Sequence, residues 1–235
     1  MQGYNDFALR VAESARIENN FVNRVFGWMT VGLAVTGGVA YYVAENHAAL
    51  LIEHSSLFLL LLVLQLVMVF GLSAAIDRIP PTAAFLGFML FAALNGVTLS
   101  VIFLAYTTSS ITQTFFVTSL TFGVMGLYGW ITRRDLTSLG SLCLMGLLGL
   151  IIASLVNIFT RSARFDLIIS AIGILIFIGL TAYDAQKIKR LAGAVGEGAI
   201  SETDGRRLAI IGALELYLDF INLFLYLLRF MGRRK

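Results

Sequence analysis

The sequence is poor in the charged residues that cover the surface of a water-soluble protein. Only 13% of its 235 residues are charged and 58% are hydrophobic, whereas an ordinary soluble domain carries about 25% charged residues. The mean hydropathy of +0.86 agrees with this imbalance. We therefore expect a polytopic membrane protein that is embedded in a lipid bilayer.

Other residue types are also scarce, and each scarcity excludes a class of site. The single cysteine, Cys143, excludes a disulfide framework and any site built from several cysteines. The two histidines, His47 and His54, fall in one expected outer loop and leave little for a metal site within the spans. Seventeen scattered basic residues and a net charge of +3 argue against a nucleic-acid partner. We expect no cofactor.

Long apolar runs fill most of the chain. A helix needs about 20 mostly apolar residues to cross a bilayer, and seven segments meet that requirement, joined by short connections. The pattern predicts an all-α integral membrane protein with seven transmembrane helices and no second soluble domain. The expected spans are roughly Phe26–Ala44, Leu57–Ile76, Thr82–Tyr106, Phe115–Ile131, Leu139–Phe159, Leu167–Lys187 and Leu208–Phe230.

The chain divides into an N-terminal cytoplasmic or interfacial segment, residues 1–23, and a seven-helix domain, residues 24–235. The first segment mixes charged and apolar residues, which suits either an amphipathic surface helix or a frayed tail. Lys and Arg residues favour a cytoplasmic N-terminus. The basic C-terminal tail conflicts with that rule, so either the upstream charges dominate or the last segment is re-entrant. We expect residues 191–205, rich in glycine, to form a flexible connection.

Acidic residues inside the spans are the most informative feature. Asp219 lies twelve residues after Arg207 and ten before Arg229, which places it near mid-membrane. A carboxyl group at that depth must face protein or water. Glu215 lies one turn earlier on the same face, so their helix cannot face lipid, and we expect the two groups to titrate together.

Three further residues have two interpretations each. Asp184 either pairs locally with Lys187 near the cytoplasmic interface or brings a second carboxylate into the bundle. Arg78 either pairs with its neighbour Asp77 or reaches inward toward Asp184. Asn222 lies three residues after Asp219 and either bonds a neighbouring helix or lines the same face as the carboxyl groups.

These acids predict a site that handles protons or cations. Carboxylates bind and release protons, and they are hard oxygen ligands suited to Ca²⁺, so Asp184 and Asp219 are also a candidate metal site. A protonated pair could close a path that a deprotonated pair opens. The chain has no HExxH or GxSxG motif, and we expect no enzyme activity; the alternative is an intramembrane aspartyl protease using the same two aspartates.

Four segments resemble the transmembrane Bax inhibitor motif family. Ala182–Ile188 (AYDAQKI) and Leu216–Phe224 (LYLDFINLF) look like signatures of that family. Thr132–Leu136 (TRRDL) and Asn95–Ser100 (NGVTLS) are similar to its bacterial branch. The resemblance covers nearly the whole chain from about residue 23 onward.

The resemblance implies a fold, a function and roles for residues. It implies seven helices with the last one at the centre, surrounded by the other six, in a bacterial inner membrane. It implies a pH-sensitive Ca²⁺ leak in which Asp184 and Asp219 form a hydrogen-bonded pair and sense protons. Arg78 is the candidate gating arginine, although its surroundings depart from the family's arginine-rich pattern, and Gln65 stands where some members carry an acid. Glu215 and Asn222 would support the pair.

The same resemblance also implies a different class of function. Some bacterial relatives are associated with membrane-anchored ATP-dependent proteases, so the chain is alternatively an interaction protein that modulates a protease or a stress response without transport. In that case residues 1–23 and the basic tail would carry the function, and Asp219 would be dispensable.

Overall fold

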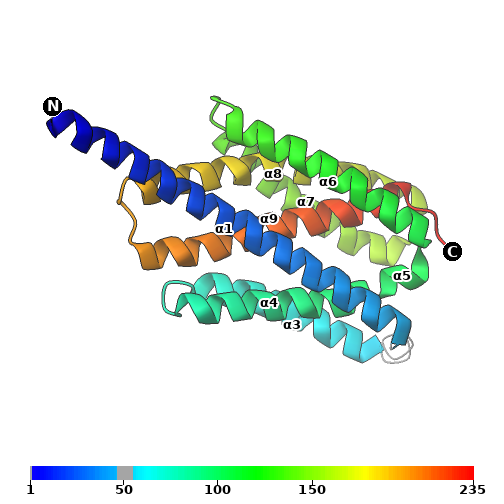
Figure 1. The fold of residues 1–235 in the computed structure, drawn as a ribbon. Helices are drawn as coiled ribbons and strands as arrows, with labels where there is room; N and C mark the ends of the chain where they lie inside the picture. Colours follow the sequence, from blue (N-terminus) through cyan, green and yellow to red (C-terminus); the bar gives the residue numbers. More distant parts are fainter. Residues whose placement is uncertain (1, 47–54) are drawn as a thin grey trace. The chain divides into compact units, whose positions relative to one another are not determined.

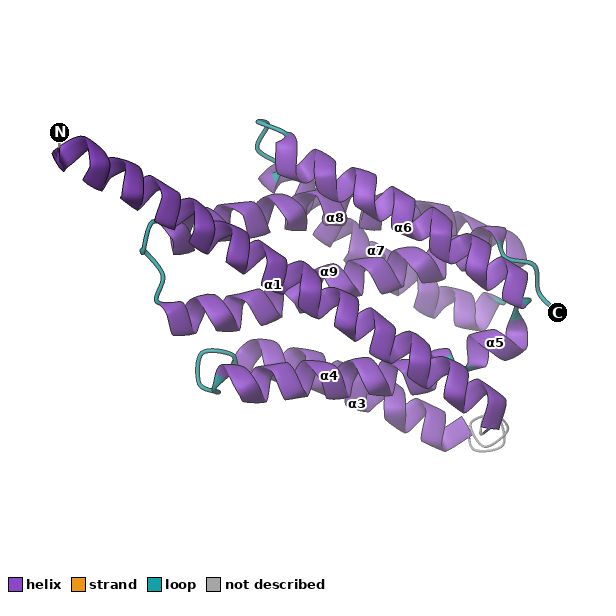
Figure 2. Ribbon diagram, in the orientation of Figure 1, coloured by secondary structure: helices purple, strands orange, loops and turns teal. Residues whose placement is uncertain are grey.

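The computed structural model describes residues 2–46 and 55–235, and helices dominate both ranges (Figure 1). Figure 2 shows no β-strand in these ranges; an isolated antiparallel bridge joins Tyr106 to Arg234. His47 and His54, expected in an outer loop, lie outside the described residues. The helices are α1 (Gln2–Asn46), α3 (Ser55–Ala75), α4 (Pro81–Leu99), α5 (Val101–Ala105), α6 (Thr108–Ile131), α7 (Thr137–Thr160), α8 (Ala163–Gly196) and α9 (Glu202–Met231).

The predicted fold class is confirmed. Within the described residues, seven helices are long and apolar enough to cross a membrane, with α4 and α5 together forming one of them. Burial differs strongly between them. In the apolar window of α9, 61% of residues are buried, against 6% in α3 and 11% in α7. The exposed leucines of α3 and α7 suit lipid contact, whereas most of the apolar window of α9 is covered by protein.

Helix α1 is longer than the first predicted span. Its 45 residues extend about 68 Å at about 1.5 Å per residue, roughly twice the thickness of a hydrocarbon core. It continues without a break through residue 23, where sequence analysis ended the N-terminal segment. Of the two interpretations of that segment, the structure shows a helix rather than a frayed tail.

The third predicted span is interrupted at Ser100. Its N–H donates to the carbonyl oxygens of both Gly96 and Val97, at 3.0 and 3.3 Å, and its hydroxyl donates to Val97 at 2.7 Å. These bonds tighten the last turn of α4, and the short α5 continues the span. Apolar composition alone does not reveal the break, because apolar residues continue on both sides of Ser100.

The predicted flexible connection at residues 191–205 is mostly helical. Helix α8 continues to Gly196 and α9 begins at Glu202, leaving a short turn in which Gly198 adopts a φ of +75°. The expectation was wrong because hydropathy marks where a helix leaves the bilayer and not where it ends. Ser201 begins α9 by accepting from the Asp204 N–H at 3.1 Å, an N-terminal cap.

The described chain forms two compact units that share α8 and α9. The first unit comprises residues 1–102 and 188–214, and the second comprises residues 103–187 and 215–235. In the first unit α4 packs against α1 and α3 (Figure 1). The close approach depends on Gly96, because a Cβ there would lie 2.6 Å from the carbonyl oxygen of Thr36. Gln65 of α3 donates to Thr98 at 3.1 Å. This interhelical bond joins α3 to the segment Asn95–Ser100.

In the second unit α6 and α8 both pack against α9 through aromatic rings. Phe115 and Phe122 of α6 meet Phe220 edge to face, at centroid distances of 5.7 and 5.5 Å. Phe177 of α8 stacks on Tyr226 at 5.8 Å. These contacts bury the stretch of α9 that follows Asp219.

The C-terminal tail pairs with the connection between α5 and α6. The Thr107 N–H donates to the carbonyl oxygen of Arg233 at 3.2 Å, and the Lys235 N–H donates to that of Ala105 at 3.1 Å. Helix α9 runs without interruption to Met231. A continuous helix that ends beside the α5–α6 connection is a full span, so the structure does not support a re-entrant last segment.

Candidate functional site

Two glycines hold the middle of α8 against its neighbours in the second unit. A Cβ on Gly129 of α6 would collide with the carbonyl oxygen of Ala182. A Cβ on Gly140 of α7 would lie 2.5 Å from the ring of Tyr183. The glycines therefore let α6 and α7 approach α8 immediately before Asp184, which fixes the backbone that carries this carboxyl group.

Gln186 ties the same stretch of α8 to the α6–α7 connection. Its Oε1 accepts the Leu136 N–H at 2.9 Å, and its Nε2 donates to the carbonyl oxygen of Arg134 at 2.8 Å. The first bond satisfies a backbone donor at the start of α7, where Leu136 itself provides no side-chain cap. The segment Thr132–Leu136 thus has a structural role: it anchors α8 two residues after Asp184.

The opposite side of this stretch brings together Asp184 and Asp219, as the family resemblance implies. Asp219 is 4% exposed and Asp184 is half-buried. Their side chains are joined by a hydrogen bond. Within the described residues, Oδ2 of Asp219 is buried without a hydrogen-bond partner. Carboxylates only accept hydrogen bonds, so the bond between the two groups requires a proton on one of them.

One turn along both helices, an ion pair lies beside the carboxyl pair. Nζ of Lys187 on α8 donates to Oε1 of Glu215 on α9 at 2.6 Å. From the sequence, Lys187 is one possible local partner of Asp184, and Glu215 is the expected coupled partner of Asp219. The structure instead gives the ammonium group to Glu215 and leaves the two aspartates to each other.

Two other predicted site residues form hydrogen bonds to backbone groups of their own segments. Nδ2 of Asn222 donates to the carbonyl oxygen of Leu218 at 2.8 Å, within its own helix. Arg78 lies in the turn after α3, with an exposed side chain and a backbone bond to Ala75 at 2.9 Å. Arg78 belongs to the first unit and Asp184 to the second, so its role as a gate stays a prediction.

The donor set bears on the suggested metal site. The described residues contain no group of three or more His, Cys, Asp or Glu side chains that could hold a metal ion. Ca²⁺ takes six to eight oxygen ligands, and Asp184 and Asp219 together supply at most four. A Ca²⁺ ion at this pair would have to take its other ligands from water or backbone carbonyl groups.

Comparison with known proteins decides the family. A protein-family model described as inhibitor of apoptosis-promoting Bax1 matches residues 18–235. The chain belongs to this Bax inhibitor family. Among its relatives, the inner membrane protein YbhL of Escherichia coli (strain K12) is 45% identical over 217 residues, which cover 92% of each chain. An uncharacterized protein of Borreliella burgdorferi is 44% identical over 221 residues, covering 93% of this chain and 94% of the relative. A Deinococcus radiodurans protein is 42% identical over 214 residues, covering 91% and 90%.

This member of the Bax inhibitor family also uses residues that sequence analysis did not assign to the site. Gln186 was quoted within a signature segment but given no role, although a polar side chain inside an apolar span was a usable signal. Gly129 packs α6 against α8. Its position next to the backbone that precedes Asp184 is visible only in the structure.

Proposed function

We propose that the chain is a pH-sensitive cation leak, with Ca²⁺ as its cargo, gated by protonation of Asp184 and Asp219. The observation that carries this proposal is the hydrogen bond between these two side chains, at a place where Asp219 is 4% exposed. Membership of the Bax inhibitor family supports the same function. The chain would lie in a bacterial inner membrane with its N-terminus in the cytoplasm.

The chemistry of the pair supplies the switch. With one proton shared, the two carboxyl groups attract each other and hold α8 against α9 within the second unit. When that proton leaves as the pH rises, two like charges face each other in a medium that screens them weakly. The repulsion favours separation of the two side chains, and the exposed carboxylates attract a cation. The leak is therefore closed when the pair is protonated and opens as it loses its proton.

The neighbouring ion pair confines this charge change to the aspartates. The Lys187 ammonium group and the Glu215 carboxylate, 2.6 Å apart, balance each other. Without Lys187, three acidic groups would share one stretch of two adjacent helices. A balanced neighbour lets the charge of the carboxyl pair vary with pH while the surrounding charge stays constant.

Calcium flux into vesicles tests the proposal. We expect purified protein in liposomes to pass more Ca²⁺ as the pH is raised from about 6 to about 8, because the pair loses its proton in that direction. Asp219→Asn removes the titrating group, so the flux should vary less than about twofold over the same range. Asp166→Asn is the matched control, because Asp166 is a half-buried acid at the start of α8 that pairs with Arg229 instead. Its pH profile should match that of the unaltered chain.

Two results would contradict the proposal. The first is an unchanged pH profile in Asp219→Asn. The second is no flux above that of empty vesicles from protein whose helical circular dichroism shows that it is folded. The second result favours the alternative, an interaction protein that modulates a membrane-anchored protease. That alternative is supported by the N-terminal part of α1, where Leu9 and Val11 are 68% and 53% exposed.

A further inference from the structure

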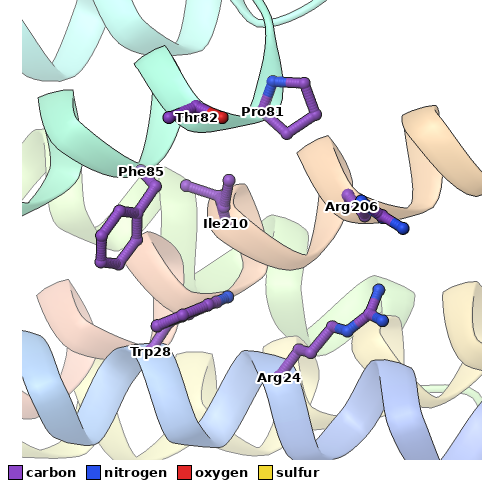
Figure 3. A pocket seen from close by; sticks show the side chains of 7 residues that line it. All are labelled: Arg24, Trp28, Pro81, Thr82, Phe85, Arg206 and Ile210. Carbon is purple, nitrogen blue, oxygen red and sulfur yellow. The ribbon is translucent and has the colours of Figure 1, made fainter.

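A pocket of about 360 Å³ lies in the first unit, and neither Asp184 nor Asp219 lines it. Its walls come from α1, from the first turns of α4 and from the second and third turns of α9. Figure 3 shows the side chains that line it. We find no role for it in the proton-dependent leak, since its lining contains no acidic residue.

The pocket is divided into a charged end and an apolar end. Arg24 and Arg206 lie together on one side, and Trp28 and Phe85 lie on the other (Figure 3). The two aromatic rings are in contact, with centroids 4.5 Å apart and an angle of 50° between their planes. Figure 3 also shows the indole nitrogen of Trp28 at the end of its ring nearer to the arginines.

Both guanidinium groups retain donors for an anion. Arg206 donates from Nη2 to Glu202, a pair whose side chains are 54% and 77% exposed, and Glu202 is not part of the pocket lining. Such an exposed pair contributes little and is readily exchanged. Arg24 forms no ion pair within the described residues, and its positive charge acts on the same Glu202. An arginine fork matches the oxygens of a phosphate group.

The start of α4 adds to the preference for an anion and indicates the depth of the pocket. Pro81 and Thr82 of the first turn line it, and Pro80 offers no side-chain cap to the free N–H groups of that turn. Free N–H groups at a helix start favour negative charge. The third apolar span begins at Pro81, so the arginines lie near the level of lipid headgroups. Tryptophan is enriched at the same level.

We propose that this pocket binds one anionic phospholipid. Its phosphate lies between Arg24 and Arg206 near the first turn of α4, and the beginning of an acyl chain packs on Trp28 and Phe85. Basic pockets between transmembrane helices are known to suit anionic headgroups. The charge, the apolar end and the depth together select a lipid over a free phosphate ion, which would leave the aromatic end unfilled. This proposal is independent of the proposed leak.

Tryptophan quenching by brominated lipid tests it directly. The chain has two tryptophans, so Trp130→Phe leaves Trp28 as the reporter. The protein is placed in vesicles of phosphatidylcholine with a minor share of phosphatidylglycerol, and bromine is carried on the acyl chains of one lipid or the other. We expect brominated phosphatidylglycerol to quench Trp28 far more than its share of the lipid predicts. The preference should fall about fivefold in Arg24→Gln and again in Arg206→Gln, the usual effect of removing one basic residue near anionic lipid.

The controls separate this site from general attraction to a charged membrane. Arg16→Gln removes a charge two turns away on α1, outside the pocket lining, and should leave the preference within about twofold. Arg24→Lys should restore part of it. Millimolar inorganic phosphate should not reduce the quenching if the acyl chain contributes to binding.

Three outcomes would overturn the proposal. One is equal quenching by both brominated lipids, which is the result expected if the pocket takes an acidic peptide instead. Another is loss of the preference in Arg16→Gln to the same extent as in Arg24→Gln. The third comes from native mass spectrometry of the unaltered chain, which does not depend on the tryptophan variant: failure to retain one phosphatidylglycerol in excess over Arg24→Gln.

Discussion

Nζ of Lys187 lies 2.6 Å from Oε1 of Glu215, on the two helices that carry Asp184 and Asp219 and one turn away from them. The ammonium and carboxylate side chains are 40% and 29% exposed. Water therefore screens this pair in part, so removing one partner costs less than it would in a fully buried pair. Its main effect is to fix the charge beside the carboxyl pair.

A double-mutant cycle on this pair should show coupling. Lys187→Met leaves the Glu215 carboxylate uncompensated near two other acids, and we expect it to lower the free energy of unfolding by about 1–2 kcal/mol. Adding Glu215→Gln should recover part of that loss, because the stranded charge is removed. Thermal unfolding of the four proteins in one detergent measures the cycle. Strictly additive effects would show that the two groups do not interact in solution.

Gly129 should tolerate no side chain. A Cβ at this position would collide with the backbone of α8 at Ala182, so Gly129→Ala must push α6 and α8 apart, and we expect a loss of about 1–3 kcal/mol. Gly126→Ala is the control on the same helix, because nothing lies within 4 Å of a Cβ there. It should be neutral or slightly stabilising, since alanine is the better helix former. Equal thermal stabilities for the two variants would contradict the packing described above.

Gln186 should matter for stability through its two hydrogen bonds. Gln186→Leu leaves the Leu136 N–H and the Arg134 carbonyl group without this partner, and each loss of this kind costs about 1–3 kcal/mol when the group stays buried. Gln113→Leu, at an exposed position of α6, is the control for the change in side-chain type. Midpoints of thermal unfolding compare the two. A Gln186→Leu protein as stable as Gln113→Leu would mean that water replaces the glutamine.

The tail and the α5–α6 connection should be reached from the same side of the membrane. Single cysteines are introduced by Lys235→Cys or Ser109→Cys in a Cys143→Ala background, which removes the native thiol. Because the tail pairs with residues 105–107, a membrane-impermeant maleimide should label both cysteines in sealed vesicles, or neither. Arg133→Cys, at the other end of α6, should show the opposite behaviour. Labelling of Lys235→Cys together with Arg133→Cys would restore the re-entrant interpretation.

Much of this fold could be predicted from hydropathy, because span length is set by the bilayer. The seven spans follow from apolar runs alone. The ends of the helices do not: α1 and α8 continue well past their apolar windows, since a helix in water is marked by caps and turns rather than by hydropathy. The break at Ser100 depends on one hydroxyl bonding its own helix, which leaves no mark in composition.

The candidate site was partly predictable for a similar reason. A carboxyl group at the depth of Asp219 is costly, so its importance could be deduced without a structure. Which groups it meets depends on the rotation of α8 about its axis. That rotation decides that Lys187 meets Glu215 and that Asp184 meets Asp219, and the tight approaches at Gly129 and Gly140 contribute to it. Residue spacing along one helix could not distinguish these partners from the local Asp184–Lys187 pair.

The fit between Gly140 and Tyr183 also constrains how this sequence can change over evolutionary time. The Tyr183 ring occupies the space that a side chain at position 140 would need. The residue at one of these positions therefore limits which residues the other can accept. A larger residue at position 140 becomes acceptable only after the ring at position 183 has shrunk or turned. Any lineage taking that route passes through a less stable ancestor, in which the neighbouring Asp184 is held less firmly.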